Sequence, residues 1–230
     1  MVKPLNATEF LAERGWLSLT PARFRKEVLA RIQMREFARG EPIYHAGDIG
    51  GGLWVIIKGA IEVELPPPEQ APILVHFATP GWWFGEWPLI NEQPRRVTII
   101  AAVPSTLATL PLAECNAILA ADPGAWRWIA VLSSMTTDLT GGVVADLMLR
   151  DPVHRTAALL LRLSGVRGMA AAKEPFPIHL SQEKLAHMVN LSRNSIMPIL
   201  HDFAQRRYIE IGYGSIVVLN ARGLSETIAH

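Results

Sequence analysis

Residues 181–220 read SQEKLAHMVNLSRNSIMPILHDFAQRRYIEIGYGSIVVLN and hold the clearest local pattern in this 230-residue chain. Ser181 is a suitable N-cap for a first helix, because its hydroxyl can accept a hydrogen bond from a free N–H of the first turn. Asn190 can adopt the left-handed conformation that ends this helix, and Ser192 offers a second N-cap. The stretch predicts two short amphipathic helices, since apolar residues recur at helical spacing in both: Leu185, Met188, Val189, Ile196, Ile199, Leu200 and Phe203.

A hairpin is predicted directly after the second helix. The runs 208–211 and 216–219 are largely apolar and flank the turn sequence Gly212-Tyr213-Gly214-Ser215. Helix, turn, helix and hairpin in this order are typical of a winged helix-turn-helix domain. In such a domain the second helix lies in the major groove of DNA and presents its N-terminal side chains to the bases.

The start of the second helix carries side chains that can read base edges. Arginine pairs with guanine O6 and N7, and asparagine pairs with adenine N6 and N7. We therefore expect Arg193, Asn194 and Ser195 to face the groove. An ordinary pair of surface helices would show the same periodicity, but solvation alone does not explain three such residues ahead of an apolar rear face.

The charge distribution agrees with this prediction. Residues 1–150 hold 13 Lys+Arg and 15 Asp+Glu, a net charge of −2, whereas residues 151–230 hold 9 and 6, a net charge of +3. The positive excess therefore lies in the segment that would contact phosphates, although an excess of three charges is small.

The bulk composition limits the class of protein. Half of the residues are hydrophobic, so the chain can bury a core, and its length suggests two domains. No apolar run approaches the 18 or so residues of a membrane span, and the N-terminus lacks the apolar core of a signal peptide. The single cysteine, Cys115, excludes an intrachain disulfide and a metal site built on several thiolates. We expect a cytoplasmic protein.

The first half of the chain has a different pattern. Residues 1–35 are amphipathic in the manner of helices. From Glu36 onward, glycine and proline separate short apolar runs, which suggest the strands of a sandwich or barrel: 53–57, 61–65, 73–77, 97–103 and 107–110. Residues 111–121 then return to a helical pattern.

A long helix is predicted from about residue 125 to Leu149. Its apolar stripe would pack either on the chain's own barrel or on a second copy of the helix: Ile129, Leu132, Met135, Leu139, Val143 and Leu147. Gly141-Gly142 lies in mid-helix, where each glycine costs about 1 kcal/mol relative to alanine. Asp151-Pro152 then begins another helix, as N-cap and first helical residue. We expect domains at 1–122, 123–150 and 151–230.

Three motifs in this order make the chain similar to the Crp/Fnr family of bacterial transcription regulators. These are Gly47-Asp48 through Gly59, the segment FGEWPLINEQPRRVT at 84–98, and LSRNSI at 191–196. The resemblance implies an α+β fold: an N-terminal β-roll (a double-stranded β-helix), a long dimerisation helix and a C-terminal winged helix-turn-helix domain. The implied partners are double-stranded DNA, a second copy of the chain and RNA polymerase, the last through the loop 165–177.

The segment 84–98 resembles the phosphate-binding cassette of cyclic-nucleotide domains, so the implied effector is a small anion such as cyclic AMP or cyclic GMP. By this resemblance Glu86 accepts from a ribose hydroxyl and Arg95 neutralises a cyclic phosphate. Arg96 stands where nucleotide binders have a small or hydroxyl residue, so it could crowd the pocket or suit another anion. The resemblance completes the expected effector site with three more residues: Gly85, Thr98 and Thr140.

On the DNA side, the resemblance brings Ser181, Gln182 and Ser192 near phosphates and Arg193, Asn194 and Ser195 near bases. Asn194 and Pro198 depart from the best-known member of the family, which implies a different operator. Hinges for effector-driven motion are expected at both Gly141-Gly142 and Asp151-Pro152. Two alternatives stay open: a regulator without effector, whose pocket is vestigial and filled by Arg96, and a cupin-type barrel enzyme. The enzyme would need clustered metal ligands, yet His45 and His76 are far apart in sequence.

Overall fold

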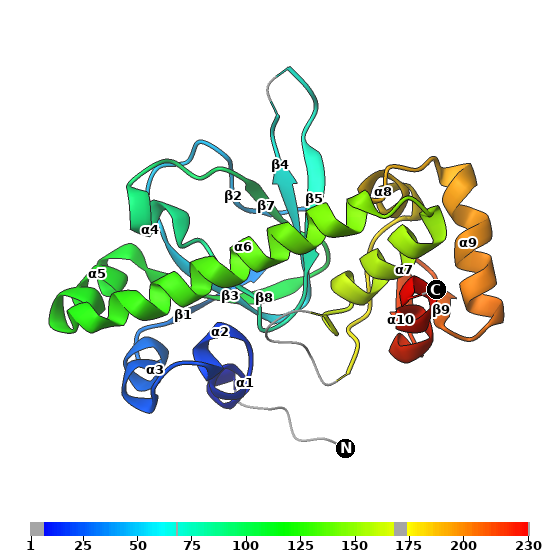
Figure 1. Ribbon diagram of the computed structural model, residues 1–230. Coiled ribbons are helices and arrows are strands. Elements are labelled where there is room, and N and C mark those ends of the chain that lie inside the picture. Colours follow the sequence, from blue (N-terminus) through cyan, green and yellow to red (C-terminus); the bar gives the residue numbers. More distant parts are fainter. Residues whose placement is uncertain (1–6, 68, 168–173, 230) are drawn as a thin grey trace. The chain divides into compact units, whose positions relative to one another are not determined.

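The computed structural model describes residues 7–67, 69–167 and 174–229 (Figure 1). The contacts within the chain form two units, one of Met1–Ile73 with Thr79–Thr137 and one of Leu74–Ala78 with Asp138–His230. The division falls inside the long helix, between Thr137 and Asp138. The three domain ranges expected from the sequence therefore stay a prediction, and each unit is described below by itself.

The first unit opens with three short helices, α1 (Ala7–Glu13), α2 (Gly15–Ser18) and α3 (Ala22–Leu29). They form because apolar side chains at helical spacing can be buried together: Leu11, Trp16, Leu17 and Val28 have no exposed surface. The Trp16 indole N–H also donates to the carbonyl of Trp128, 2.6 Å away. The amphipathic helices predicted for residues 1–35 are confirmed between residues 7 and 29; residues 1–6 lie outside the described residues, and residues 33–35 belong to a strand instead.

Two four-stranded sheets follow and form the β-roll, with strand orders β1-β8-β3-β6 and β2-β7-β4-β5 (Figure 1). The five apolar runs predicted as strands are confirmed. Three further strands, β1, β2 and β6, were not predicted, because β1 is largely exposed and the other two have at most three residues. The strands are β1 (Gln33–Phe37), β2 (Pro42–Tyr44), β3 (Gly52–Lys58), β4 (Ile61–Leu65), β5 (Ile73–Ala78), β6 (Trp83–Phe84), β7 (Thr98–Ala101) and β8 (Ser105–Pro111).

Helices complete this unit. α4 (Trp87–Asn91) lies between β6 and β7, and α5 (Leu112–Ala121) follows β8. A single 3₁₀ turn, η1 (Pro123–Ala125), leads into the long helix α6 (Trp126–Met148). The core of the unit joins α1–α3, the first sheet, α5 and the start of α6, and includes Val55, Trp83, Ala108, Ile118 and Leu132.

The apolar residues of α6 differ in burial between the first and second halves of the helix. Ile129 and Leu132 are buried in the core of the first unit, with 2% and 1% exposure, and Met135 packs against that core. Further along, Val144 is 57% exposed and Leu147 is 44% exposed. The first half therefore packs on its own barrel, and the second half presents apolar side chains to the surface.

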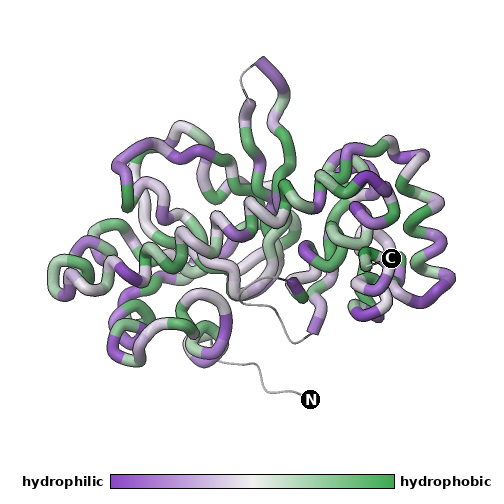
Figure 2. The backbone as a smooth tube through the Cα atoms, in the orientation of Figure 1, coloured by the Kyte–Doolittle hydropathy of each residue, from purple (hydrophilic) through white to green (hydrophobic). Residues whose placement is uncertain are grey.

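The second unit contains a winged helix-turn-helix domain, together with residues 74–78 of β5 and the second half of α6. The elements of this domain are α7 (Pro152–Leu163), α8 (Gln182–Met188), α9 (Arg193–Gln205), β9 (Ile209–Gly212), β10 (Ser215–Val218) and α10 (Ala221–Ala229). Asp151 caps α7 as predicted, since its Oδ1 accepts from the Val153 N–H at 2.7 Å. Hydrophilic and hydrophobic positions alternate along α9 in the manner of an amphipathic helix (Figure 2). The fold class predicted from the sequence is confirmed.

Candidate ligand site and nucleic-acid interface

The turn between β6 and α4 forms the centre of the candidate ligand site. Gly85 has φ +97°, and a Cβ added there would lie 2.8 Å from both Arg95 Nη1 and the Gly52 carbonyl oxygen. Only glycine fits this backbone without a clash. Glu86 follows and is 7% exposed. The turn therefore places a buried carboxylate beside a buried guanidinium.

Glu86 connects this turn to the long helix. Its Oε1 accepts a hydrogen bond from the Thr136 hydroxyl on α6 at 2.9 Å, and it makes no side-chain hydrogen bond as the N-cap of α4. Thr136 was not predicted. The sequence instead favoured Thr140, one turn later, which is exposed and lies in the second unit. The assignment of Thr140 to the ligand site stays a prediction.

Arg95 is 7% exposed and held by backbone carbonyls. Nη1 donates to the Gly85 carbonyl at 2.8 Å and Nη2 donates to the Gly52 carbonyl at 3.1 Å. These two bonds use two of the five N–H groups of a guanidinium. Burial lowers the pKa of Arg95 from its ordinary value, but an arginine remains charged at neutral pH. Arg95 is thus a fixed positive charge with donor capacity left over.

A series of neighbouring aromatic rings begins beside the Arg95 guanidinium. Cζ of Arg95 lies 4.3 Å from the ring centre of Tyr44, which in turn lies 6.0 Å from the ring centre of Phe84. Trp82 stacks on Phe84 with 4.9 Å between ring centres. Burial raises the pKa of the Tyr44 hydroxyl, so this group stays neutral. Sequence reasoning missed Tyr44 because it lies in a three-residue strand with no clear pattern.

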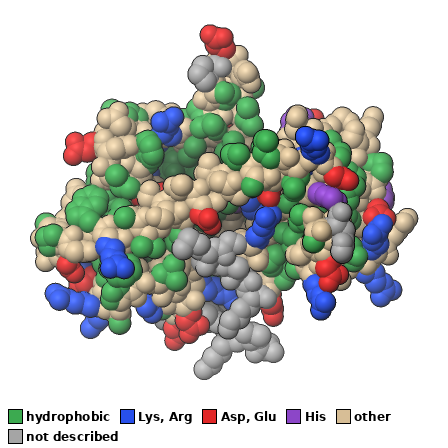
Figure 3. Space-filling view, viewed as in Figure 1, with side chains coloured by type: hydrophobic (Ala, Val, Ile, Leu, Met, Phe, Trp, Pro, Cys, Tyr) green, Lys and Arg blue, Asp and Glu red, His purple; other side chains and the backbone are tan. Residues whose placement is uncertain are grey.

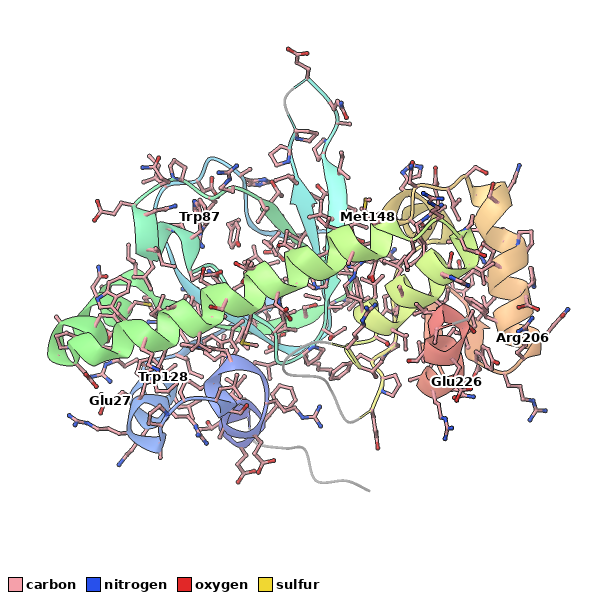
Figure 4. The ribbon with its side chains drawn as sticks, viewed as in Figure 1. Glu27, Trp87, Trp128, Met148, Arg206 and Glu226 are labelled. Carbon is pink, nitrogen blue, oxygen red and sulfur yellow. The ribbon has the colours of Figure 1, made fainter. Side chains whose placement is uncertain are left out.

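The remaining predicted ligand residues lie around this centre. Arg96 is exposed, and its Cζ lies 5.4 Å from the ring centre of Trp87, which Figure 4 labels on α4. The structure therefore does not show the pocket-filling Arg96 that the sequence suggested. The Thr98 hydroxyl accepts from the Ala46 N–H at 3.1 Å and so holds the segment after β2.

The helix-turn-helix has the predicted caps. The Ser181 hydroxyl accepts from the Lys184 N–H at 3.2 Å, and the Ser192 hydroxyl accepts from the Ser195 N–H at 3.1 Å. Asn190, with φ +55°, has the expected left-handed conformation. The two helices pack through buried side chains: Leu185, Met188, Val189, Ile196, Leu200 and Phe203. Ile199, predicted on the same face, is only partly buried.

The predicted base-contacting residues stand at the exposed start of α9. Arg193, Asn194 and Ser195 are all exposed, and Gln182 is partly exposed at the start of α8. The Ser195 hydroxyl lies 2.8 Å from the Ser192 hydroxyl, so it takes part in the cap. The side chains of Arg193 and Asn194 are therefore the best placed of the three to reach a ligand.

The hairpin forms the predicted wing. β9 and β10 pair antiparallel, and Ile178 adds a bridge to Ile216. Tyr213 at the tip is fully exposed. An open groove of about 660 Å³ lies between α9 and the hairpin, lined by Gln182, Met197, His201, Ala204, Arg207, Ile209, Glu210, Ile211 and Leu219. This groove was not predicted.

Basic side chains do not gather into one patch on the face shown in Figure 3. Arg206, labelled at the end of α9 in Figure 4, pairs with Asp202 at 2.9 Å. Among the described residues no helix is long and apolar enough to cross a membrane. The same residues contain no group of three His, Cys, Asp or Glu side chains placed to bind a metal ion.

Comparison with known proteins agrees with this geometry. Residues 34–122 match the model of the cyclic nucleotide-binding domain, and residues 154–227 match that of the Crp-like helix-turn-helix domain. The chain belongs to the Crp/Fnr family of transcription regulators. As a member of this family it is a DNA-binding regulator and not an enzyme, so the cupin alternative is wrong.

Individual relatives support the same assignment. The chain is 29% identical to the HTH-type transcriptional regulator Cmr of Mycobacterium tuberculosis, covering 84% of this chain and 75% of that protein. It is 25% identical to a CRP-like cAMP-activated global transcriptional regulator of the same organism, covering 85% and 88%. A transcriptional regulator of the CRP family from Thermus thermophilus has the same fold, with a TM-score of 0.63, 22% identity and coverage of 85% and 97%.

Proposed function

We propose that this Crp/Fnr regulator binds its operator as a homodimer, through α9 in the major groove and the β9–β10 wing beside it. The exposed apolar side chains of the second half of α6 support a helix-to-helix dimer contact; Met148, labelled in Figure 4, is 76% exposed. A two-fold symmetric dimer would read two half-sites about one helical turn apart.

The observation that carries this proposal is the exposure of Arg193 and Asn194 at the capped start of α9. Arg193 can donate two hydrogen bonds to guanine, and Asn194 can donate one to adenine and accept one from it. Ser181, Gln182 and Ser192 flank them and supply hydroxyl and amide groups for phosphates.

The test is selection of an operator from random DNA with the full-length protein, followed by affinity measurement at fixed salt. Arg193→Ala should weaken specific binding by about 5- to 150-fold and relax the preference at one guanine, since a bidentate pair contributes about 1–3 kcal/mol. Arg222→Ala is the matched control, because Arg222 is an exposed arginine on α10 that pairs with Glu226. Equal losses in both variants would contradict the proposal.

We also propose that the site around Arg95 binds a small anionic effector, with cyclic AMP and cyclic GMP as the first candidates. Arg95 supplies positive charge, Glu86 supplies an acceptor for a hydroxyl, and the Gly85 backbone lies between them. Arg96, Thr98 and Thr140 are assigned to the same site. A ligand that competes for Glu86 would change its bond to Thr136, which offers a direct path to α6.

A specific observation favours the alternative of a regulator without effector: Arg95 is already engaged by two carbonyls and one aromatic ring. Calorimetric titration with cyclic AMP and cyclic GMP separates the two. Saturable binding by the wild type that is lost in Arg95→Ala and kept in Arg222→Ala, a control at an exposed arginine of α10, supports the effector site. Absence of binding at millimolar nucleotide, with operator binding intact, supports the alternative.

The location and the transcriptional partner follow from the same proposal. A regulator that reads chromosomal operators would act in the cytoplasm, where the DNA is. RNA polymerase is the proposed protein partner. The segment 165–177, to which this contact is assigned, includes residues 168–173, which lie outside the described residues.

A further inference from the structure

One stripe of α9 continues from Arg193 through Met197 to His201. Residues four apart in an α-helix are rotated by only about 40°, so these three side chains follow one another along the same side. Arg193 and His201 are exposed and Met197 is partly exposed. Met197 and His201 also line the groove between α9 and the wing. Met197 is therefore the central side chain of the stripe that begins with Arg193.

The neighbouring serine does not share this stripe. Position 195 is rotated by about 200° from position 193, and the Ser195 hydroxyl lies 2.8 Å from that of Ser192. After Arg193 and Asn194, the next side chain available on this side of α9 is the thioether of Met197. The side of α9 that begins with Arg193 thus changes from polar to apolar within about one helical turn.

Methionine limits what this position can recognise. It has no hydrogen-bond donor and its sulfur is a weak acceptor, while its unbranched side chain is flexible and polarizable. The apolar group that base edges present in the major groove is the C5 methyl of thymine. The buried face of α9 is already formed by Ile196, Leu200 and Phe203, each at most 1% exposed. Met197 is therefore available for a contact outside the core.

We propose that Met197 is a specificity-determining residue that contacts the C5 methyl group of one thymine in each half-site. The inference rests on the proposed DNA-binding function. Four residues of helix advance about 6 Å, and base pairs are spaced about 3.4 Å apart. The thymine lies within about two base pairs of the guanine that Arg193 reads.

The experiment replaces thymine by deoxyuridine, which removes only the methyl group. The operator is first selected with the full-length protein, and each thymine of one half-site is then replaced singly. At one position the wild type should lose about fourfold in affinity, the size expected for one methyl group. Met197→Ala should bind more weakly and no longer distinguish thymine from uracil at that position. Met197→Leu should retain the distinction.

The controls separate a base contact from a general loss of folding. Met34→Ala removes a methionine that is 47% exposed on β1 in the first unit and should leave affinity and uracil sensitivity unchanged. Thermal unfolding of Met197→Ala should match that of the wild type. A wild type indifferent to uracil at every position, or a Met197→Ala variant with undiminished sensitivity, would overturn the inference while leaving sequence-specific binding intact. Failure to select any sequence would overturn the DNA-binding proposal together with it.

Discussion

The carboxylate of Asp146 and the guanidinium of Arg162 form a buried ion pair, with 3.0 Å between Oδ2 and Nε and only 6% of each side chain exposed. Arg167 binds the other oxygen of Asp146 at 2.8 Å. Asp146 lies in the second half of α6 and Arg162 lies on α7. The end of α6 is thus fixed to α7 of the DNA-binding domain. Removing one partner of this ion pair would leave the other charge buried and unpaired, which is strongly destabilising.

Arg155 on α7 also holds the junction between α6 and α7. Nη1 donates to the carbonyls of Leu149 and Arg150, at 2.8 and 3.0 Å, and Nε donates to that of Val189 at the end of α8, at 3.1 Å. The turn around Asp151-Pro152 is therefore held to two helices of the DNA-binding unit. Of the two hinges expected from the sequence, these contacts favour Gly141-Gly142.

Asp146→Asn should destabilise the DNA-binding unit by about 3 kcal/mol, because it leaves Arg162 buried without its counter-charge. Urea unfolding of the full-length protein, followed by circular dichroism, measures the loss. Asp202→Asn is the matched control. It breaks a surface pair with Arg206 in which both side chains are more than 40% exposed, and it should leave the transition unchanged. Equal shifts of the urea midpoint in the two variants would show that the buried ion pair contributes no more to stability than the surface pair.

Gly141→Ala combined with Gly142→Ala should slow hydrogen exchange in the middle of α6. Neither added Cβ would lie within 4 Å of another group, and each replacement favours the helix by about 1 kcal/mol. In the wild type, protection should be lowest around these glycines and higher near Ile129 and Asp146. Ser134→Ala, in the first half of α6, should not change the exchange at 141–142. Uniform protection along the wild-type helix would contradict the hinge. A change in the molecular mass of the double variant in solution would instead point to a role of the glycines in the dimer contact.

The helix-turn-helix was predictable because its signals are local. Each cap involves residues at most three apart, such as Ser192 with Ser195, and the apolar spacing of α9 needs no knowledge of the rest of the fold. The apolar strands of the roll were predictable for the same reason. β1 was missed because four of its five residues are exposed, so no apolar run marks it.

The ligand site was only partly predictable because it depends on distant contacts. Glu86 and Arg95 were found through a motif, but their partners Thr136 and Tyr44 lie about 50 residues away in sequence. Nothing in the local sequence distinguishes Thr136 from Thr140, since both are threonines on one side of the same helix. The Asp146–Arg162 pair was missed because it forms only when α7 folds back against α6.

Gly85→Ala should destabilise the protein more than Gly40→Ala. Both glycines have positive φ, +97° and +81°, so each alanine incurs a conformational cost of about 1–2 kcal/mol. At Gly40 the added Cβ meets nothing within 4 Å, whereas at Gly85 it meets Arg95 Nη1 and the Gly52 carbonyl at 2.8 Å. Thermal unfolding should show a further loss at Gly85 of about 1 kcal/mol or more, as for other overpacked sites. Equal losses would contradict the close packing around Arg95.

Cys115 should resist alkylation in the folded protein. Burial raises the pKa of its thiol to about 11, whereas an unfolded chain ionises near an ordinary thiol pKa of about 8.5. The resulting contribution to stability is complete below about pH 8.5 and is lost as the pH rises toward 11. Iodoacetamide labelling at pH 8 should be slow without denaturant and rapid in urea. Equally fast labelling in both conditions would contradict the burial of this residue.

Tyr213→Ala should weaken DNA binding by about three- to tenfold on every sequence tested. The side chain is fully exposed at the tip of the wing, where tyrosine can contact the sugar-phosphate backbone without reading bases. The range corresponds to the loss of one net hydrogen bond or a similar contact. Tyr213→Phe shows whether the hydroxyl or the ring is responsible.

Trp87→Ala is the matched control for this prediction, because Trp87 is an aromatic residue 44% exposed in the other unit, and its removal should not change DNA affinity. Fluorescence anisotropy with the selected operator and with an unrelated duplex measures both effects. A loss confined to the operator would mean that Tyr213 reads sequence, like Arg193. Unchanged affinity on both duplexes would mean that the tip of the wing does not reach the DNA.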